Sequence, residues 1–416
     1  MKRAFVNMGL IAGSVLISLV ILELIARSFY DVPSPYPTKP GIIVYDQRGF
    51  WSMEPGLESS IDNIVDFRNK QLTIHENGSR KLPCLNQTGT HAQDIYLIGD
   101  SQTFGWGLSD DETWANQTQC LLNKKVPGRY RISNLGVPGI QVDQYVMRGI
   151  RQVLQRIKNN DIVVISMTWN DLVGFYSSPD WVTSRLKDAQ LVEGRSANGG
   201  IIVTADPAPQ PGHPGLVTAP PTDLNFVGSR PYTRLAPETW RYNFYQQYGL
   251  FVPMVDSAEN FLYSMNYVSA GFRLVWSRAK LLFYKIRPAD SFFKKVPADS
   301  YKFNFLSLKA LSHRLEKQGA RVLVQFLPNR VFFDDYYYYS YSKNGTVFPV
   351  RDFFWHIGKP FCDSLKLNCI NRFDDLKTSD RDAHTFSYDG HYNAIAAERI
   401  GLALARDIID FSPPLK

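Results

Sequence analysis

The chain lacks the sequence features that mark several common classes of protein. Its 46 basic and 39 acidic residues give a net charge of +7, yet no run of about five or more basic residues exists and no nucleic-acid-binding motif accompanies them. It has no glycine-rich phosphate loop ending in lysine, and its seven histidines form no cluster at metal-ligand spacing. We therefore expect no nucleic-acid partner, no metal and no cofactor.

Cysteine is also scarce. The chain has four cysteines, and none forms the Cys-x-x-Cys pair that is typical of zinc and redox sites. An even number permits disulfides in an exported protein. Cys362 and Cys369 are the easiest pair to join, and Cys84 with Cys120 would complete the set. Four buried thiols explain the sequence almost as well, so the count decides neither.

A long apolar run opens the chain. It extends over about twenty residues, from Met8 to Ile25, which is roughly the length that crosses a bilayer as a helix. The residues after it offer a poor signal-peptide cleavage site, and a buried core helix rarely opens a chain in this way. Residues 1–30 are therefore predicted to form an uncleaved membrane anchor.

Charges flank this run on both sides. Lys2 and Arg3 precede it and favour a cytoplasmic N-terminus, which sends the rest of the chain outward. Near its end, Glu23 and Arg27 lie four residues apart, where the two side chains can pair at the membrane surface. The proline-rich residues 31–40 are predicted to form a stalk.

Beyond the stalk, short apolar runs alternate with helical patterns. The predicted strands are 94–98, 130–134, 161–167, 320–327 and 367–370, and the predicted helices are 113–125, 141–158, 305–318, 353–365 and 393–410. Strands and helices that alternate at these lengths predict an α/β fold, with a doubly wound, flavodoxin-like parallel sheet and helices on both of its faces.

The alternation is interrupted once. Residues 174–299 are rich in proline, tyrosine and tryptophan, with a predicted loop at 199–221 and helical segments within 242–285. This stretch is predicted to be a large insertion after the third strand of a domain formed by 41–173 and 300–416. Its role as a lid, a binding surface or a docking site for a membrane partner stays open.

Residues that can carry chemistry follow three of the predicted strands. Ser101 follows the first strand, Gly139 the second and Asn170 the third, and the carboxyl ends of parallel strands meet at one edge of a sheet. A serine hydroxyl can act as a nucleophile, while a glycine N–H and an asparagine amide are donors suited to an oxyanion hole. Each residue alone is as well explained by a turn or a helix cap, so the prediction depends on their joint placement.

A serine nucleophile also needs a base. Of the seven histidines, His384 and His391 lie in the segment before the last predicted helix, where the chain can return to the sheet edge. We favour His391 because it directly precedes that helix, which would fix its position.

These segments resemble the SGNH, or GDSL, hydrolase superfamily in four blocks and in their order. The blocks are residues 99–107 (GDSQTFGWG), 134–139 (NLGVPG), 169–171 (WND) and 389–393 (DGHYN). The chain looks most similar to a bacterial subgroup with an N-terminal membrane segment, whose upstream Asn-x-x-Gly-x-Arg run is approximated by residues 77–80.

The resemblance implies a role for each matching residue. Ser101 would be the nucleophile and would also offer its own N–H to the oxyanion hole, together with the Gly139 N–H and the Asn170 side-chain amide. His391 would act as general base and then as general acid. Asp389 would orient His391, although the commonest family pattern has its aspartate three residues before the histidine, where this chain has Tyr388. The first half of an Asp-Gly turn explains Asp389 equally simply.

The resemblance also implies a function and a location. We expect a serine esterase that hydrolyses acyl esters, such as O-acetyl groups, of an envelope or exported glycan. An O-acyltransferase would use the same residues, and a non-catalytic envelope assembly protein could retain the same fold. The expected location is a bacterial inner membrane, crossed once, with the catalytic domain in the periplasm or outside the cell and a membrane or envelope protein as a further partner.

Overall fold

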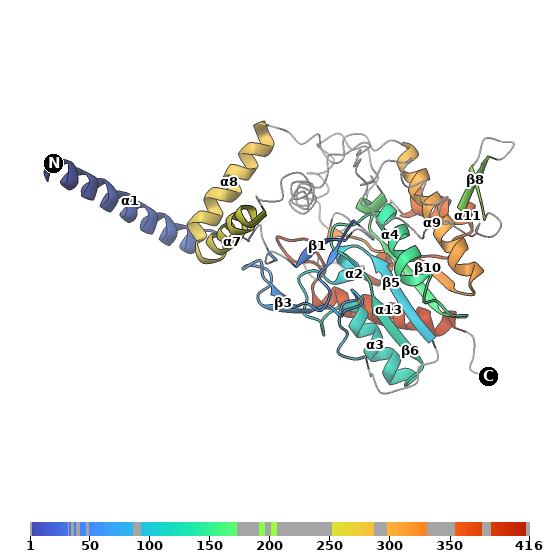
Figure 1. Cartoon of the computed structure of the whole chain (residues 1–416). Coiled ribbons are helices and arrows are strands. Elements are labelled where there is room, and N and C mark those ends of the chain that lie inside the picture. Colours follow the sequence, from blue (N-terminus) through green and yellow to red (C-terminus); the bar gives the residue numbers. More distant parts are fainter. Residues whose placement is uncertain are drawn as a thin grey trace.

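The computed structural model describes most of residues 41–173 and 300–416, the N-terminal helix and parts of the segment between residues 174 and 299. The described residues are 2–31, 33–34, 37–38, 42–46, 50–85, 93–172, 191–195, 201–205, 252–286, 298–330, 354–376 and 384–412. The predicted stalk lies partly outside this set. Figure 1 shows a globular α/β body from which one long helix projects.

A five-stranded parallel sheet forms the centre of the body. Its strands are β5 (Gln93–Gly99), β6 (Tyr130–Asn134), β7 (Ile162–Met167), β10 (Arg321–Phe326) and β11 (Cys369–Asn371). They are ordered β11-β10-β7-β5-β6, so counted along the chain the order is 2-1-3-4-5. This is the flavodoxin-like order, and the predicted fold class is confirmed.

Both faces of the sheet are buried because its strands are apolar throughout. Side chains that alternate along β5 and β7 enter two separate cores: Tyr96 and Val163 lie in one, Leu97 and Val164 in the other. The first core is covered by α4 (Val142–Arg148), α9 (Ala298–Lys317) and α11 (Lys359–Leu365), and the second by α3 (Trp114–Lys125), α12 (Phe373–Leu376) and α13 (Ala394–Phe411).

Helices α3 and α13 pack closely because a glycine lies between them. A Cβ at Gly401 would lie 2.7 Å from Cβ of Gln117 and 2.9 Å from the Trp114 carbonyl oxygen. The Thr118 hydroxyl donates to the carbonyl of the same glycine at 3.2 Å. This contact fixes the last helix against the first half of the domain.

Two short antiparallel hairpins precede the sheet. They are β1 (Ile43–Asp46) with β2 (Phe50–Met53), and β3 (Glu58–Ile61) with β4 (Lys70–Thr73). The segment after β4 reaches the sheet at Arg80, whose N–H donates to the Asn134 carbonyl at 2.9 Å.

The segment after β7 contains a hairpin and two helices. The hairpin pairs β8 (Leu191–Arg195) with β9 (Ile201–Ala205), so the loop predicted for 199–221 is wrong over β9. Two neighbouring glycines and many prolines indicated a loop, but the run Ile-Ile-Val-Thr-Ala has strong β propensity. Helices α7 (Val252–Val268) and α8 (Ala270–Ile286) match the helical segments expected there.

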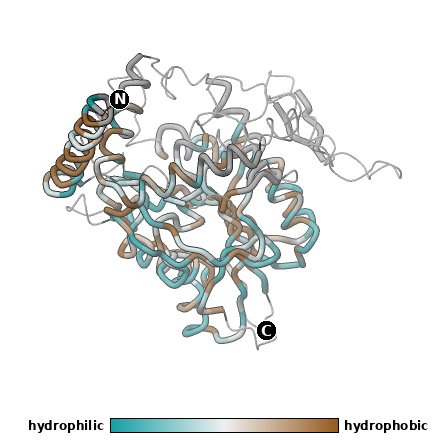
Figure 2. Tube along the Cα trace, turned by 60° about the vertical axis from the view of Figure 1, so that its left-hand side comes forward, coloured by the Kyte–Doolittle hydropathy of each residue, from teal (hydrophilic) through white to brown (hydrophobic). Residues whose placement is uncertain are grey.

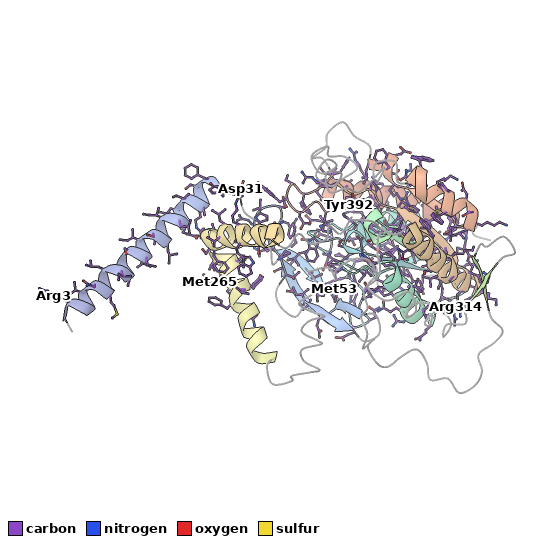
Figure 3. All side chains as sticks on the ribbon, turned by 90° about the horizontal axis from the view of Figure 1, so that it is seen from above. Arg3, Asp31, Met53, Met265, Arg314 and Tyr392 are labelled. Atoms are coloured by element: carbon purple, nitrogen blue, oxygen red, sulfur yellow. A yellow bond between two sulfur atoms is a disulfide. The ribbon has the colours of Figure 1, made fainter. Side chains whose placement is uncertain are left out.

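The N-terminal helix α1 (Lys2–Phe29) stands apart from the α/β body (Figure 1). Within it, Val6–Phe29 is long and apolar enough to cross a membrane, and its apolar side chains are exposed along most of its length. In Figure 2 the trace of this helix is mostly brown and white, whereas the trace of the body mixes teal and brown. In Figure 3, Arg3 marks the free end of α1, and Asp31 marks the end that lies beside α7 and α8.

Both candidate disulfides are formed. Cys84 is bonded to Cys120, and Cys362 to Cys369. The first bond ties the segment before β5 to α3, and the second ties the end of α11 to β11. The pairing considered from the sequence is therefore the pairing observed. The alternative, in which all four cysteines are buried thiols, is not observed.

Candidate active site

Ser101 lies where β5 gives way to the short helix α2 (Ser101–Phe104). The Asp100 carboxylate caps this helix by accepting from the Gln102 N–H at 2.9 Å. At the other end, Gly105 has a φ of 87° and donates its N–H to the Ser101 carbonyl, a conformation that glycine adopts without strain. Gly99 is equally constrained, because a Cβ there would lie 2.7 Å from the Ser166 carbonyl oxygen. The serine is thus held in a tight turn at the sheet edge.

The structure brings Ser101, His391 and Asp389 into one hydrogen-bonded chain. His391 Nε2 lies 2.8 Å from Ser101 Oγ, and His391 Nδ1 is hydrogen-bonded to Asp389 Oδ1. A carboxylate can only accept, so Nδ1 carries the proton toward Asp389 and Nε2 offers a lone pair to the serine hydroxyl. The side chains of His391 and Asp389 are 21% and 13% exposed, so the chain of contacts opens to solvent at the histidine.

The His391 loop is tied to the turn that carries Ser101. The Tyr392 N–H donates to Gln102 Oε1 at 3.2 Å, and Asn393 caps α13 by accepting from the Ala396 N–H. His384 lies elsewhere: it is 1% exposed, and its Nε2 is 3.4 Å from a guanidinium nitrogen of Arg399. Of the two candidate bases, only His391 reaches the serine.

Two residues that the sequence analysis did not identify hold Asp389. The carboxylate of Asp66 accepts the N–H groups of Tyr388 and Asp389, at 3.1 and 2.8 Å. The Trp106 indole N–H donates to Asp389 Oδ2 at 3.3 Å, while its ring packs against His391. The side chain of Tyr388, at the position where the common family pattern has aspartate, is 49% exposed. Trp106 lies inside the first sequence block, whereas nothing in the sequence pointed to Asp66.

The expected oxyanion-hole residues follow the neighbouring strands β6 and β7. Gly139 follows β6 in a turn with a φ of 76°, and this segment is fixed to β5 by the Val137 N–H, which donates to the Gly99 carbonyl at 3.0 Å. The N–H of Ser101 is the first of α2 and so has no acceptor within its helix. Asn170 lies in the 3-10 turn Trp169–Leu172 directly after β7, and its side-chain amide is outside the described part of the chain.

Two buried carboxylates, those of Asp100 and Asp171, bind the loops that follow β5 and β7 at this edge of the sheet. Asp171 accepts from the Thr168 N–H and hydroxyl at 2.7 and 3.1 Å, and the same hydroxyl lies 3.3 Å from Asp100. Burial raises the pKa of Asp171 well above its usual range, and the charge of Asp100 adds to the effect. Burial likewise raises the pKa of Asp100, against the Gln102 amide and the charge of His391. Both aspartates fasten loops rather than face the serine.

Arg80 fixes the loop that follows α2. Its guanidinium is buried, pairs with Asp110 at 2.9 Å, and donates to the carbonyls of Phe104, Gly105 and Leu108 at 2.6 to 2.9 Å. In the sequence, this arginine stands out only as the last residue of the run 77–80 that approximates the family pattern. Within the described residues, no three His, Cys, Asp or Glu side chains group as metal ligands.

Part of the chain is similar to a known protein family. The model of the GDSL-like lipase/acylhydrolase family matches residues 97–243, a range that contains Ser101, Gly139 and Asn170 and ends before His391. A comparison with curated proteins returned no match.

The solved structures that are similar to this chain are distant from it in sequence. An acetyl xylan esterase from Geobacillus stearothermophilus is 14% identical, with 79% of this chain and 99% of that chain covered and a TM-score of 0.35. A carbohydrate acetylesterase from Sinorhizobium meliloti is 10% identical, with 77% and 100% covered and a TM-score of 0.36. A lipase/acylhydrolase from Enterococcus faecalis is 10% identical, with 78% and 100% covered and a TM-score of 0.36. Over residues 97–243, the chain is therefore similar to the GDSL-like lipase/acylhydrolase family.

Proposed function

We propose that this chain is a serine ester hydrolase in which Ser101 is the nucleophile, His391 the general base and acid, and Asp389 the residue that orients His391. The observation that carries the proposal is the position of one imidazole between a serine hydroxyl and a carboxylate. A serine needs such a base to attack at neutral pH, and the base needs its tautomer fixed.

The first half of the reaction follows from these contacts. His391 Nε2 takes the proton from Ser101 Oγ as that oxygen bonds to the ester carbonyl carbon, and the carbonyl electrons move onto its oxygen. Asp389 stabilises the imidazolium that forms. When the carbonyl re-forms, the bond to the alkoxy group breaks, and His391 gives that group the proton, so an alcohol leaves and an acyl-serine remains.

The second half releases the acid. His391 Nε2 takes a proton from water, the resulting oxygen nucleophile adds to the acyl carbon, and the proton returns to Ser101 Oγ as its bond to the acyl group breaks. In both halves the negative charge on the carbonyl oxygen would be stabilised by the N–H groups of Ser101 and Gly139 and the side-chain amide of Asn170. The placement of these three residues at the ends of neighbouring strands supports this role.

We further propose that the substrates are acyl esters of an envelope or exported glycan, with O-acetyl groups as the first choice. The proposed anchor α1 supports this, because it would hold the catalytic domain at the outer surface of the inner membrane, next to envelope polymers. The two disulfides also fit a domain in an oxidising compartment.

Replacement of the nucleophile tests the proposal. The full chain in mild detergent is expected to hydrolyse p-nitrophenyl acetate and to react with a fluorophosphonate probe, and Ser101→Ala should abolish both. Ser364→Ala, at an exposed serine on α11, serves as the matched control and should retain both. Unchanged turnover and labelling in a folded Ser101→Ala protein would refute the mechanism, and an unreactive wild-type chain would favour a non-catalytic protein.

A further inference from the structure

Glu23 in α1 binds the start of helix α8. Its carboxylate accepts from the Ser269 hydroxyl at 2.7 Å and from the N–H groups of Ala270 and Gly271 at 3.0 and 2.8 Å. Free N–H groups at a helix start favour a negative charge, so this glutamate is the N-terminal cap of a helix nearly 250 residues further along the chain. A residue that the sequence suggested only as half of an ion pair therefore joins two distant helices.

At the same junction, arginine side chains bind the last carbonyl groups of α7. Arg27 pairs with Glu23 at 2.7 Å and also donates to the Val268 carbonyl at 2.8 Å. Arg273 of α8 donates to the carbonyls of Asn266 and Tyr267 at 2.7 and 3.2 Å. The last carbonyls of α7 thus have cationic partners while the first amides of α8 have an anionic one.

The two segments also fit closely in shape. A Cβ at Gly271 would lie 3.2 Å from Glu23 Oε2 and 3.4 Å from Leu22 Cγ, so glycine permits the approach. Ala26, on the same side of α1, is completely buried. Charged residues near the end of an apolar helix are costly unless they have partners. The junction supplies these partners, and it places α7 and α8 where α1 leaves its apolar stretch.

Apolar side chains next to this junction are exposed. They belong to α7 and α8, and their exposed fractions are 61% for Phe261, 44% for Tyr267, 58% for Val268 and 54% for Val275. At the same end of α1, Phe29 is 76% exposed. Exposed apolar side chains of all three helices thus form an apolar surface near the junction that no described residue covers.

The charge and composition of α8 indicate which kind of molecule covers this apolar surface. Its sequence, AGFRLVWSRAKLLFYKI, has no acidic residue and combines aromatic residues with four basic ones, of which Arg273 belongs to the junction and the other three do not. Basic amphipathic helices with aromatic residues are typical of segments that lie in the headgroup region of a bilayer containing anionic lipid. In Figures 1 and 3, α8 runs across the direction of α1 rather than along it. A bilayer crossed by α1 would therefore have α8 along its surface.

We propose that α7 and α8 form an interfacial helical pair that lies on the bilayer crossed by α1, with Phe261 and Val275 at the level of the upper acyl chains. Lipid then covers the exposed apolar surface. The contacts of Glu23 fix the position of the helical pair along the axis of α1, and thus its depth in the bilayer. The pair adds a second membrane contact to the single crossing, so the catalytic domain is held at a fixed orientation above the lipid.

Lipid quenching of site-specific labels tests this directly. All four native cysteines are in disulfides, so single cysteines at Leu16, Phe261, Val275 and Leu402 can be labelled with the environment-sensitive fluorophore NBD in the full chain. Each protein is reconstituted into vesicles of phosphatidylcholine and phosphatidylglycerol, with and without a doxyl-labelled phospholipid. Leu16 lies in α1 and reports whether the anchor is inserted. Leu402 on α13 is 47% exposed and is the matched control on the catalytic domain.

The expected result is that the doxyl lipid quenches the labels at Leu16, Phe261 and Val275 at least about twofold more than the label at Leu402. Quenching at Leu16 alone would overturn the inference while leaving the anchor intact, and a protein partner would then be the occupant. No quenching at Leu16 would overturn both the anchor and the inference. Neither result bears on Ser101, because the ester assay is carried out separately in detergent.

Discussion

Replacement of Arg80 should show how strongly the loop behind the nucleophile depends on one buried cation. The Arg80 guanidinium is 1% exposed and binds the Asp110 carboxylate together with the carbonyls of Phe104, Gly105 and Leu108. Arg80→Met keeps most of the side-chain volume but removes the charge and all five N–H donors. It leaves a buried carboxylate without its cation and buried carbonyls without donors.

The size of the effect follows from these contacts. A hydrogen bond to a charged group contributes about 1.5–3 kcal/mol, and removal of one partner from a buried ion pair costs about 3–5 kcal/mol. These two costs overlap because the same group makes both interactions, so we expect Arg80→Met to lower the free energy of unfolding by about 4 kcal/mol. Arg80→Lys keeps the charge but cannot reproduce the planar fork of donors, and we expect an intermediate loss of about 2 kcal/mol.

Urea unfolding of the full chain in mild detergent, followed by tryptophan fluorescence, measures this loss. With an m value near 3 kcal/mol/M, a loss of 4 kcal/mol lowers the midpoint by about 1.3 M. Lys81→Met is the matched control, because Lys81 is the neighbouring cation and is exposed, and its midpoint should stay close to that of the wild type. If Arg80→Met falls within about 1 kcal/mol of this control, the assigned role of the buried guanidinium is wrong.

Three further predictions concern the site and its surroundings. Asp389→Asn should lower kcat for p-nitrophenyl acetate by about a hundredfold or more, because an amide N–H would favour the tautomer whose Nε2 cannot accept from the serine; an unchanged rate would make Asp389 a turn residue. Asp171 has a raised pKa, so the folded state binds more protons than the unfolded state above the ordinary value of 3.8, and stability should fall as pH rises through that window. In Asp171→Asn, the free energy of unfolding from urea curves should fall less steeply with rising pH than in the wild type. The same pH dependence in both proteins would contradict the prediction. Loss of the Cys84 disulfide, which closes a loop of sequence separation 36, should cost about 4 kcal/mol, against about 2.5 for the Cys362 disulfide with a separation of 7; the reverse order would contradict the loop-length argument.

Much of the sheet could be predicted because its strands are buried on both faces and read as continuous apolar runs. The predicted strand 161–167 and the observed β7 differ by one residue, and 130–134 matches β6. Helix ends were less predictable. The helix expected over 141–158 is interrupted after Arg148 by a π-helical turn, Gly149–Val153, where the missing Cβ of the glycine makes room for Leu311.

The residues that sequence analysis did not identify act through the backbone of distant segments. Asp66 accepts two main-chain N–H groups of the loop that carries Asp389, and Glu23 accepts two at the start of α8. Any amide N–H can serve as the donor in such a contact, so neither partner needs a characteristic residue type. The contact between Ser101 and His391 was predictable for the opposite reason, since the chemistry proposed for them requires a particular side chain at a particular strand or helix end.

The packing of α13 on α3 has a consequence for when the enzyme becomes reactive. Ser101 and His391 are 290 residues apart, and the loop of His391 directly precedes α13, which packs on α3 at Gly401. An emerging chain, or one cut short before residue 391, would hold a serine with no base beside it. Under the proposed mechanism, Ser101 of such a chain has no general base, so we expect acyl chemistry to begin only when the C-terminal segment has folded onto the rest of the domain.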